Sequence, residues 1–301
     1  MSQKLNPEIL KKLAENNATA KEIDWLLMAC RYQDDYGRVQ GVYYKEFCEE
    51  IGLSYQGFYD CKAGLERKGI IEVYKNNYFD IDIVILNNVY ANYEDLQKGY
   101  INTHEFFLRT ENFKKLKARA KIMCLWLYGE WKVSKKKKSE RYASSYIILK
   151  DNFMKKFKSL WPKLSERAIR GYLGQLKPFM NIYLEDGRKY YLTFKESVLR
   201  QSQRLDSENE ENREHIVEVS IRRNRVVEVT SKEKRDLQEI LRMQLKKINK
   251  LLVFDFDEII ANVLKVINCD ITNVHKWKRK LNIALVQKTV TEYLNQAAVN
   301  A

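Results

Sequence analysis

The sequence lacks long apolar runs. No stretch of about 18 apolar residues occurs in the 301-residue chain, so no membrane-spanning helix is expected. The first residues, MSQKLNPEILKKLAENN, mix charges in a helical pattern and lack the apolar core of a signal peptide. We therefore expect a cytoplasmic protein without a membrane partner.

Cysteine, histidine and proline are also scarce. The 5 cysteines form no CxxC pair and stand at scattered positions, which argues against a disulfide framework and favours buried, reduced thiols. The 3 histidines lie far apart in the sequence, so neither a zinc site nor another cofactor is expected. With only 3 prolines and 31% charged residues, the composition favours a mostly helical fold.

Motifs of common enzyme chemistry are absent as well. There is no phosphate-binding glycine loop, no GxSxG and no HExxH. LLVFDFDE at 251–258 resembles the aspartate motif of haloacid-dehalogenase-type phosphotransferases, in which two aspartates serve as nucleophile and acid. The Gly-Thr continuation of that motif is missing, and Asp255 and Asp257 precede a predicted helix, where carboxylates cap backbone N–H groups. We expect a non-enzymatic protein.

Positive charge, by contrast, is abundant and concentrated. The net charge is +14. Residues 1–112 carry 13 Lys/Arg and 18 Asp/Glu, or −5, and residues 201–301 carry 18 and 15, or +3. Residues 113–200 carry 23 Lys/Arg and 7 Asp/Glu, or +16. Positive charge concentrated on one segment is typical of a protein with a polyanionic partner, usually nucleic acid.

Residues 21–90 have the pattern of a small helix-turn-helix module. Tyr44–Ile51 is predicted to form a helix that Gly52 ends, and Ser54 is predicted to cap a second helix that runs to about Lys68. A glycine at the end of one helix and a capping serine soon afterwards give the tight joint of a helix-turn-helix.

A helix precedes this pair and a hairpin follows it. KEIDWLLMACR has its apolar residues at helical spacing, and IIEVYK and YFDIDIVIL alternate in strand fashion around Asn76-Asn77. GLSYQGFYDCKAGLERKGIIEV is similar to the helix-turn-helix and wing of bacterial winged-helix regulators, over roughly residues 21–86. The resemblance implies DNA contacts from the second helix, but the module is net acidic, so protein contact or dimerisation through exposed tyrosines is the alternative. The candidate residues are Tyr55, Gln56, Tyr59 and Lys62.

Residues 113–200 repeat this order of elements. FKKLKARAKIMCLWLYGEW (113–131) predicts a helix, YIIL a short strand, and KDNFMKKFKSLW an amphipathic helix ended by a proline. Ser165 is predicted to cap the next helix, and Asp-Gly at 186–187 to turn a two-stranded wing. Two copies of one architecture resemble the tandem winged-helix layout of plasmid replication initiators and some regulators, with the second copy covering about residues 113–196.

The helix at about 165–178 is the expected recognition helix. An apolar stripe from Ile169 to Leu176 would face the core, which leaves arginine, glycine and glutamine on or near the outer face. Arginine can bind guanine edges and glutamine can bind adenine. Gly171 and Gly174 each cost roughly 1 kcal/mol inside a helix, so they either let DNA approach or allow close helix packing in the core. The candidate contacts are Arg167, Arg170 and Gln175.

Further basic residues of this segment are candidates for phosphate contacts. The wing, at about 181–194, carries Arg188 and Lys189 at its tip, where they would reach phosphates or the adjacent groove. VSKKKKSERYASS is expected to be a flexible insert, and its lysines are either solvated or clamp the phosphate backbone. The other candidates are Lys155, Lys156 and Lys158 of the predicted amphipathic helix, which would flank the phosphates, and Lys135, Lys136, Lys137 and Lys138 of the insert.

The last third is expected to be a separate region. Residues 201–215 are polar and acidic and predict a linker. IVEVSIRRNRVVEVTS predicts a β-hairpin or, alternatively, one short helix; the tip of such a hairpin, with Arg222, Arg223 and Arg225, would touch DNA or be a solvated turn. From Ser231 onward, helical spacing favours a small bundle or a dimerisation or partner-binding domain. A winged helix followed by helices with the segment CDITNVHKWKRKL is similar in layout to primosomal DnaD-type proteins.

The expected fold is mainly α with small β-hairpins, an α+β class. Its parts are an N-terminal helical arm, a first winged helix, a connector, a strongly basic second winged helix, a polar linker, and a basic hairpin with a helical domain. Their bounds are 1–20, 21–90, 91–112, 113–200, 201–215 and 216–301.

The expected function is binding of double-stranded DNA by a transcriptional regulator that reads DNA with its second winged helix and dimerises through its C-terminal helices. The alternative is a plasmid or phage replication initiator or a DnaD-like primosomal protein, with replication proteins as partners. A further alternative is a winged-helix protein-interaction module that binds nucleic acid without sequence preference.

Overall fold

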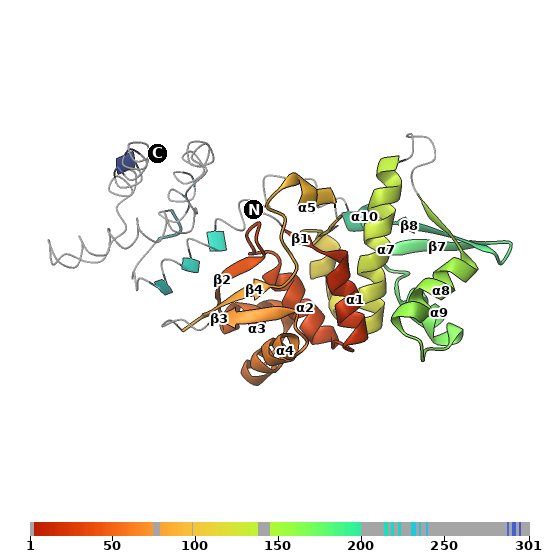
Figure 1. The fold of residues 1–301 in the computed structure, drawn as a ribbon, viewed down its shortest axis with the longest axis horizontal. Coiled ribbons are helices and arrows are strands. Elements are labelled where there is room, and N and C mark those ends of the chain that lie inside the picture. The colour runs from red at the N-terminus through yellow and green to blue at the C-terminus, as the bar shows by residue number, and fades with distance from the viewer. Residues whose placement is uncertain are drawn as a thin grey trace. The chain divides into compact units, whose positions relative to one another are not determined.

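The computed structural model describes residues 3–74, 79–97, 99–137 and 145–199, together with scattered residues from 214 onward (Figure 1). The side chains of residues 135–137 are outside this description. The chain divides into two compact units, Met1–Glu208 and Asn209–Ala301. All helices and strands named below belong to the first unit, which combines helices with small antiparallel sheets.

The first six elements after residue 19 form what we call the first repeat. The order is helix, strand, helix, helix, strand, strand, and the three strands pair antiparallel with the last strand in the centre. The predicted helix pair and the two strands after it are confirmed. The elements are α2 (Ala20–Ala29), β2 (Arg38–Val42), α3 (Tyr44–Ile51), α4 (Tyr55–Arg67), β3 (Ile71–Tyr74) and β4 (Ile81–Ile85).

Local capping explains the helix pair of the first repeat. Gly52, just past α3, has a φ of 64°, in the left-handed region that suits glycine. The Ser54 hydroxyl oxygen accepts a hydrogen bond from the Gly57 N–H, 3.0 Å away, and so caps α4. The joint between α3 and α4 is therefore fixed by residues that lie within it.

The same order of elements recurs later in the chain, and we call it the second repeat. Its strands also pair antiparallel with the last strand in the centre, in the order β6-β8-β7. The Ser165 hydroxyl accepts from the Ala168 N–H, and Asp186 and Gly187 both have positive φ, as a tight hairpin turn requires. The elements are α7 (Ala118–Lys137), β6 (Tyr146–Leu149), α8 (Lys150–Leu160), α9 (Glu166–Gln175), β7 (Met180–Glu185) and β8 (Lys189–Phe194).

Shorter elements precede, join and follow the two repeats. Strands β1 and β5 pair with each other, which ties the N-terminal segment to the connector between the repeats. Asn6 caps α1 by accepting from the Glu8 N–H. These elements are β1 (Lys4–Leu5), α1 (Pro7–Glu15), α5 (Tyr93–Gln97), β5 (Ile101–Asn102), the 3-10 helix η1 (Phe106–Arg109), α6 (Glu111–Lys114) and α10 (Glu196–Leu199).

The predicted single helix over 113–131 is wrong at its start. The chain forms α6, capped by the Thr110 hydroxyl, then turns, and α7 begins only at Ala118. Phe113 of α6 and Leu116 of the turn are both buried in the core.

The predicted flexible insert is wrong at its beginning as well, because α7 continues through Lys137. Lysine is a good helix former, and cations are favourable near the C-terminal end of a helix. Lys138 and the rest of the lysine-rich insert up to residue 144 lie outside the described residues.

The hairpin predicted for 216–230 is wrong at the positions that are described. Glu218, Val219, Arg222 and Arg223 are helical, in agreement with the alternative of a short helix. Opposite charges four residues apart, at Glu218 and Arg222, favour a helix. Arg225 lies outside the described residues, as do the Asn76-Asn77 turn and all but the last two residues of the linker.

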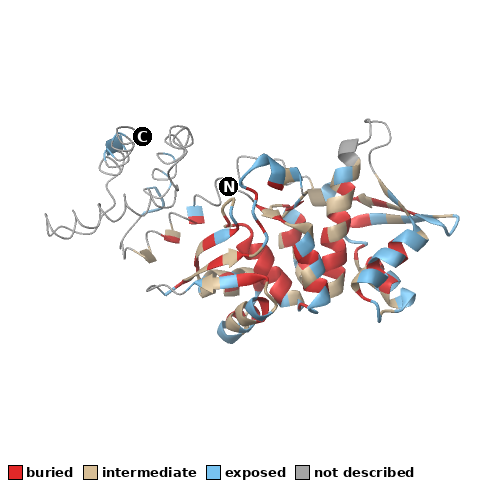
Figure 2. Cartoon of the chain, viewed as in Figure 1, coloured by how far each residue is buried: buried red, intermediate tan, exposed pale blue. Residues whose placement is uncertain are grey.

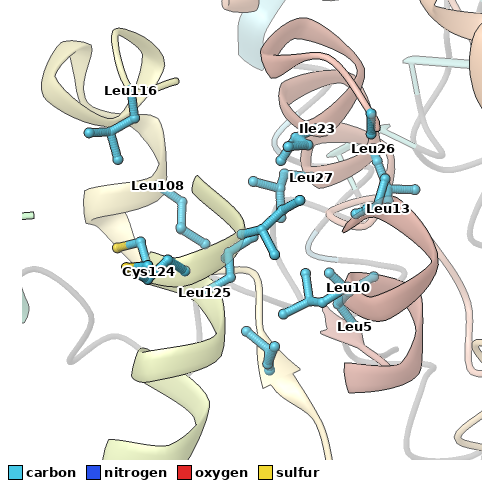
Figure 3. Packing of buried hydrophobic residues seen from close by; sticks show 14 of the residues in the cluster. Leu5, Leu10, Leu13, Ile23, Leu26, Leu27, Leu108, Leu116, Cys124 and Leu125 are labelled. Atoms are coloured by element: carbon cyan, nitrogen blue, oxygen red, sulfur yellow. The ribbon is translucent and has the colours of Figure 1, made fainter. Parts of the chain in front are cut away.

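One cluster of buried hydrophobic residues runs through both repeats (Figure 2). Helix α1 packs against α7 and α8, and α2 packs against α7. Leu10 and Leu13 of α1, Leu27 of α2 and Leu125 of α7 point toward one another in this contact (Figure 3). Because α7 is buried on nearly all sides between Ala120 and Trp131, it serves as the common core helix of the first unit. Within the described ranges, no helix is both long and apolar enough to span a membrane.

A buried ion pair lies inside this contact. Lys121 of α7 donates to Asp24 of α2, and their side chains are 0% and 4% exposed. The ammonium also lies 3.4 Å from the Ala20 carbonyl oxygen and 5.3 Å from the centre of the Phe113 ring. Burial raises the pKa of Asp24 and lowers the pKa of Lys121, while their mutual attraction opposes both changes. The two repeats are therefore joined by a charge pair that depends on both partners.

We predict that removing one partner of this pair is costly. Lys121→Met leaves a buried carboxylate alone and should lower the free energy of unfolding by about 3–5 kcal/mol. The double variant Asp24→Leu/Lys121→Met leaves no buried charge and should recover most of this loss. Urea unfolding followed by circular dichroism measures the free energy of unfolding of both variants. If the single and double variants lose equal stability, the unpaired buried charge is not the cause of the loss.

The two single variants should also depend on pH in opposite directions. In Lys121→Met, the folded state holds the Asp24 carboxyl with a raised pKa, so stability relative to wild type should rise as the pH falls below neutral. In Asp24→Asn, the folded state holds Lys121 with a lowered pKa, so stability should rise as the pH increases toward the ordinary lysine pKa. Urea midpoints over a pH series test this, and parallel pH profiles would contradict it.

Candidate nucleic-acid interface

Helix α9 has an apolar inner face and a polar outer face. Ile169 and Leu173, together with Leu176 just beyond the helix, are buried in the core, as the apolar spacing predicts. Arg167 and Arg170 are exposed on the opposite side. Gln175 is half-buried and lies between the two faces. The two arginines are therefore available to an external partner, whereas the glutamine is only partly so.

Both glycines of α9 face open space. A Cβ atom built on Gly171 or on Gly174 would meet no heavy atom within 4 Å. Close helix packing in the core, one of the two explanations open from the sequence, is therefore excluded for both positions among the described residues. Each glycine costs the helix roughly 1 kcal/mol relative to alanine, without any internal packing to offset it.

The hairpin β7–β8, which the sequence analysis predicts to be a wing, lies beside α9. Tyr190 of β8 is buried, which raises the pKa of its phenol, and the positive charge of Arg170 partly opposes this change. Arg170 is therefore close to the inner strand of the wing. At the wing tip, Arg188 and Lys189 are exposed, and the Arg188 N–H donates to the Glu185 carbonyl oxygen to close the turn. Helix α9 and the hairpin are therefore neighbouring elements, and both carry exposed cations.

The three lysines of α8 differ in their surroundings. Lys155 is exposed and forms no ion pair with a described residue. Lys156 lies over the Trp126 ring, 4.1 Å from its centre, and 3.9 Å from the Glu130 carboxylate. Lys158 is paired with Glu166 at the start of α9, at 3.2 Å. Only Lys155 is therefore free to bind a phosphate without losing a contact in the described part of the chain.

Protein-family profiles, curated proteins and solved structures contain no match to this chain. The function proposed below therefore rests on the chain's own residues.

The candidate residues of the first repeat are engaged in contacts with one another. The Gln56 amide donates to the Asp60 carboxylate at 2.8 Å, and the Lys62 ammonium lies 5.8 Å from the centre of the Tyr59 ring. The Tyr55 ring packs 4.9 Å from that of Tyr59, yet Tyr55 is 58% exposed. This surface is aromatic and carries exposed carboxylates, so it suits protein contact better than a phosphate backbone.

The structure describes the remaining candidate residues only in part. Lys135, Lys136 and Lys137 belong to the last turn of α7, but their side chains are outside the description. Arg222 and Arg223 are helical and half-buried in the second unit, while Lys138 and Arg225 are not described. The structure therefore brings together only the candidates of α8, α9 and the wing.

Two residues that the sequence analysis did not select belong to this surface. Lys177 follows α9 in the sequence, stands seven residues after Arg170 and is exposed. Tyr183 of β7 is 63% exposed and packs against Tyr191 on the wing. Lys177 could have been found as a further lysine of the basic segment 113–200, whereas the exposure of Tyr183 depends on the strand pairing.

The structure also bears on the cysteines. Cys30 and Cys124 are fully buried, and burial raises the pKa of both thiols, so neither has the character of a nucleophile. No group of three His, Cys, Asp or Glu side chains that could hold a metal ion occurs in the part of the chain that is described.

We predict that Gly171→Ala and Gly174→Ala each stabilise the protein by about 1 kcal/mol, because alanine favours the helix and its methyl group meets open space. Urea unfolding measures the change. Gly129→Ala in α7 is the matched control, because a Cβ there would approach Ile101 to 3.3 Å; it should give a smaller gain or a loss. Destabilisation by the α9 variants would contradict the open outer face.

Proposed function

We propose that this protein binds double-stranded DNA through the second repeat, used as a winged helix, and acts as a transcriptional regulator. In this proposal α9 is the recognition helix and β7–β8 is the wing. The observation that carries the proposal is the outer face of α9, where two exposed arginines accompany two glycines that no described residue packs against.

The composition of this face fits the major groove of DNA. An α-helix fits the major groove, and arginine there can bind the O6 and N7 atoms of guanine with two hydrogen bonds. Gly171 and Gly174 would let the helix backbone approach the DNA closely, where a larger side chain would hold it away. The free energy that the glycines cost the helix would then be offset by contacts that form only in the complex.

Residues around α9 would supply the contacts that do not depend on sequence. Lys155, Lys177 and the wing-tip pair Arg188 and Lys189 are exposed cations around α9 that suit phosphate oxygens. The net charge of +16 over residues 113–200 supports the same assignment. We assign the aromatic surface of α4 to protein contact, with a second copy of the chain or with a transcription protein.

A replication initiator is the second candidate function. The observation that favours it is the repetition of one element order on a common core, which holds two modules in a fixed arrangement. Such a unit suits an origin with repeated sites, and its partners would include replication proteins. Footprinting distinguishes the two: several regularly spaced sites favour an initiator, and a single site beside a promoter favours a regulator.

Charge substitutions test the division of roles. Arg170→Gln should reduce the preference for the selected sequence by about 1–3 kcal/mol, because the arginine would read a base. Lys155→Gln should weaken binding to all duplexes and lower the slope of log K against log salt by about one. Lys11→Gln, which removes an exposed charge from α1, is the matched control and should change neither quantity. Equal effects of the two test variants on every duplex would contradict the assigned roles.

The glycine variants test the close approach itself. Gly171→Ala and Gly174→Ala should weaken binding to the selected duplex even though they stabilise the fold, because each methyl group would separate the helix from the DNA. Fluorescence anisotropy with the full chain measures the affinity. If both variants bind as tightly as wild type, the outer face of α9 does not approach DNA.

A further inference from the structure

A groove lies where three segments far apart in the sequence meet. Its walls are the C-terminal end of α1, the beginning of α7, and the turn between α8 and α9. Two adjoining cavities of about 240 Å³ and about 380 Å³ share Ala14, Asn17, Arg119 and Trp161 as lining residues. The larger one is within the size range of small-molecule sites in proteins.

The floor of the groove is apolar and shaped by one small and two aromatic side chains. Trp161 stacks on Phe157, with ring centres 5.8 Å apart and planes inclined by 15°, so its ring is held in place. Tyr172 lies 6.3 Å from Trp161, and Ala118 contributes only a methyl group. Trp161 is only 4% exposed, so a small part of its ring reaches the groove, and together with Tyr172 it forms an apolar floor that suits a planar apolar group.

The rim of the groove is cationic. Lys117, Arg119 and Lys163 line it, against a single carboxylate, Glu15. None of the three cations forms an ion pair with a described residue; Arg119 makes one long contact of 3.4 Å with the Asn17 side-chain oxygen. The unbalanced positive charge around an apolar floor defines the chemistry of an occupant: a planar apolar body that carries an anionic group.

We propose that this groove is a binding site for a small aromatic anion. The rings of Trp161 and Tyr172 contact the planar body, and Arg119 with Lys163 bind the anionic group. The walls are preformed, because α1 and α7 are held together by the shared core. Tyr172 belongs to α9, but none of the lining residues is among those proposed to contact DNA, so the proposal does not depend on DNA binding.

Three compounds that share one ring system and differ in charge test the site: naphthoate, naphthylmethanol and naphthylmethylammonium. Isothermal titration calorimetry with the full chain should show one site, with naphthoate bound about four- to 25-fold more tightly than the alcohol, since each of the two solvent-accessible cations adds about two- to fivefold. The ammonium compound should bind most weakly. Equal affinities for the three compounds, or no binding of naphthoate at millimolar concentrations, would overturn the proposal.

Variants locate the binding. Arg119→Gln/Lys163→Gln should reduce naphthoate affinity to that of the alcohol and leave the alcohol unchanged. Ala118→Leu fills the groove from the first turn of α7, where leucine is a good helix former, and should weaken binding of all three compounds. Lys11→Gln removes an exposed charge outside the groove and should not change the binding of any of the three compounds. Wild-type binding by Ala118→Leu would place the compounds elsewhere and overturn the proposal.

Duplex DNA distinguishes the groove from an extension of the DNA surface. Naphthoate should bind equally well when the protein is saturated with duplex at low salt. Full displacement of naphthoate by duplex, together with loss of duplex binding in Arg119→Gln/Lys163→Gln, would show that the cations serve DNA phosphates and would overturn the proposal.

Discussion

The contact between α2 and α7 is the constraint on which the rest of the first unit depends. It places the common core helix of the second repeat against the first repeat and buries an ion pair, Asp24 with Lys121, inside the joint. A buried pair of this kind contributes little to stability while it is intact but is costly to break. It therefore favours one arrangement of the two repeats over others that bury similar apolar area.

The surface proposed to bind DNA rests on this joint through α7. Helix α7 packs against α9, β6 and β8 and so positions both α9 and the hairpin that are proposed to contact DNA. Leu125 and its neighbours on α7 are covered by α1 and α2, so the second repeat without residues 1–112 would expose apolar surface. The second repeat is therefore expected to need residues 1–112 to fold and to bind DNA. Helix α7 also forms one wall of the groove, whose other walls come from α1 and the turn before α9.

The local features were predictable from the sequence. The limits of α3 and α4, the cap at Ser165 and the wing turn depend on residues within a few positions of one another, and all are confirmed. The face of α9 was predictable in the same way, because apolar spacing determines which side enters the core. The interruption before α7 was not predictable, since it depends on Phe113 and Leu116 packing against distant elements. The groove could not be predicted from the sequence either, because its lining residues meet only through the tertiary fold.

The most direct test of the account is selection of duplexes from a random pool by the full wild-type chain, followed by affinity measurements over a salt series. We predict that the selected duplexes share a sequence, and that their affinity falls steeply with salt while staying above that of unselected duplexes. If the chain binds no duplex at low salt, the positive charge of residues 113–200 serves another partner and the outer face of α9 has a different role.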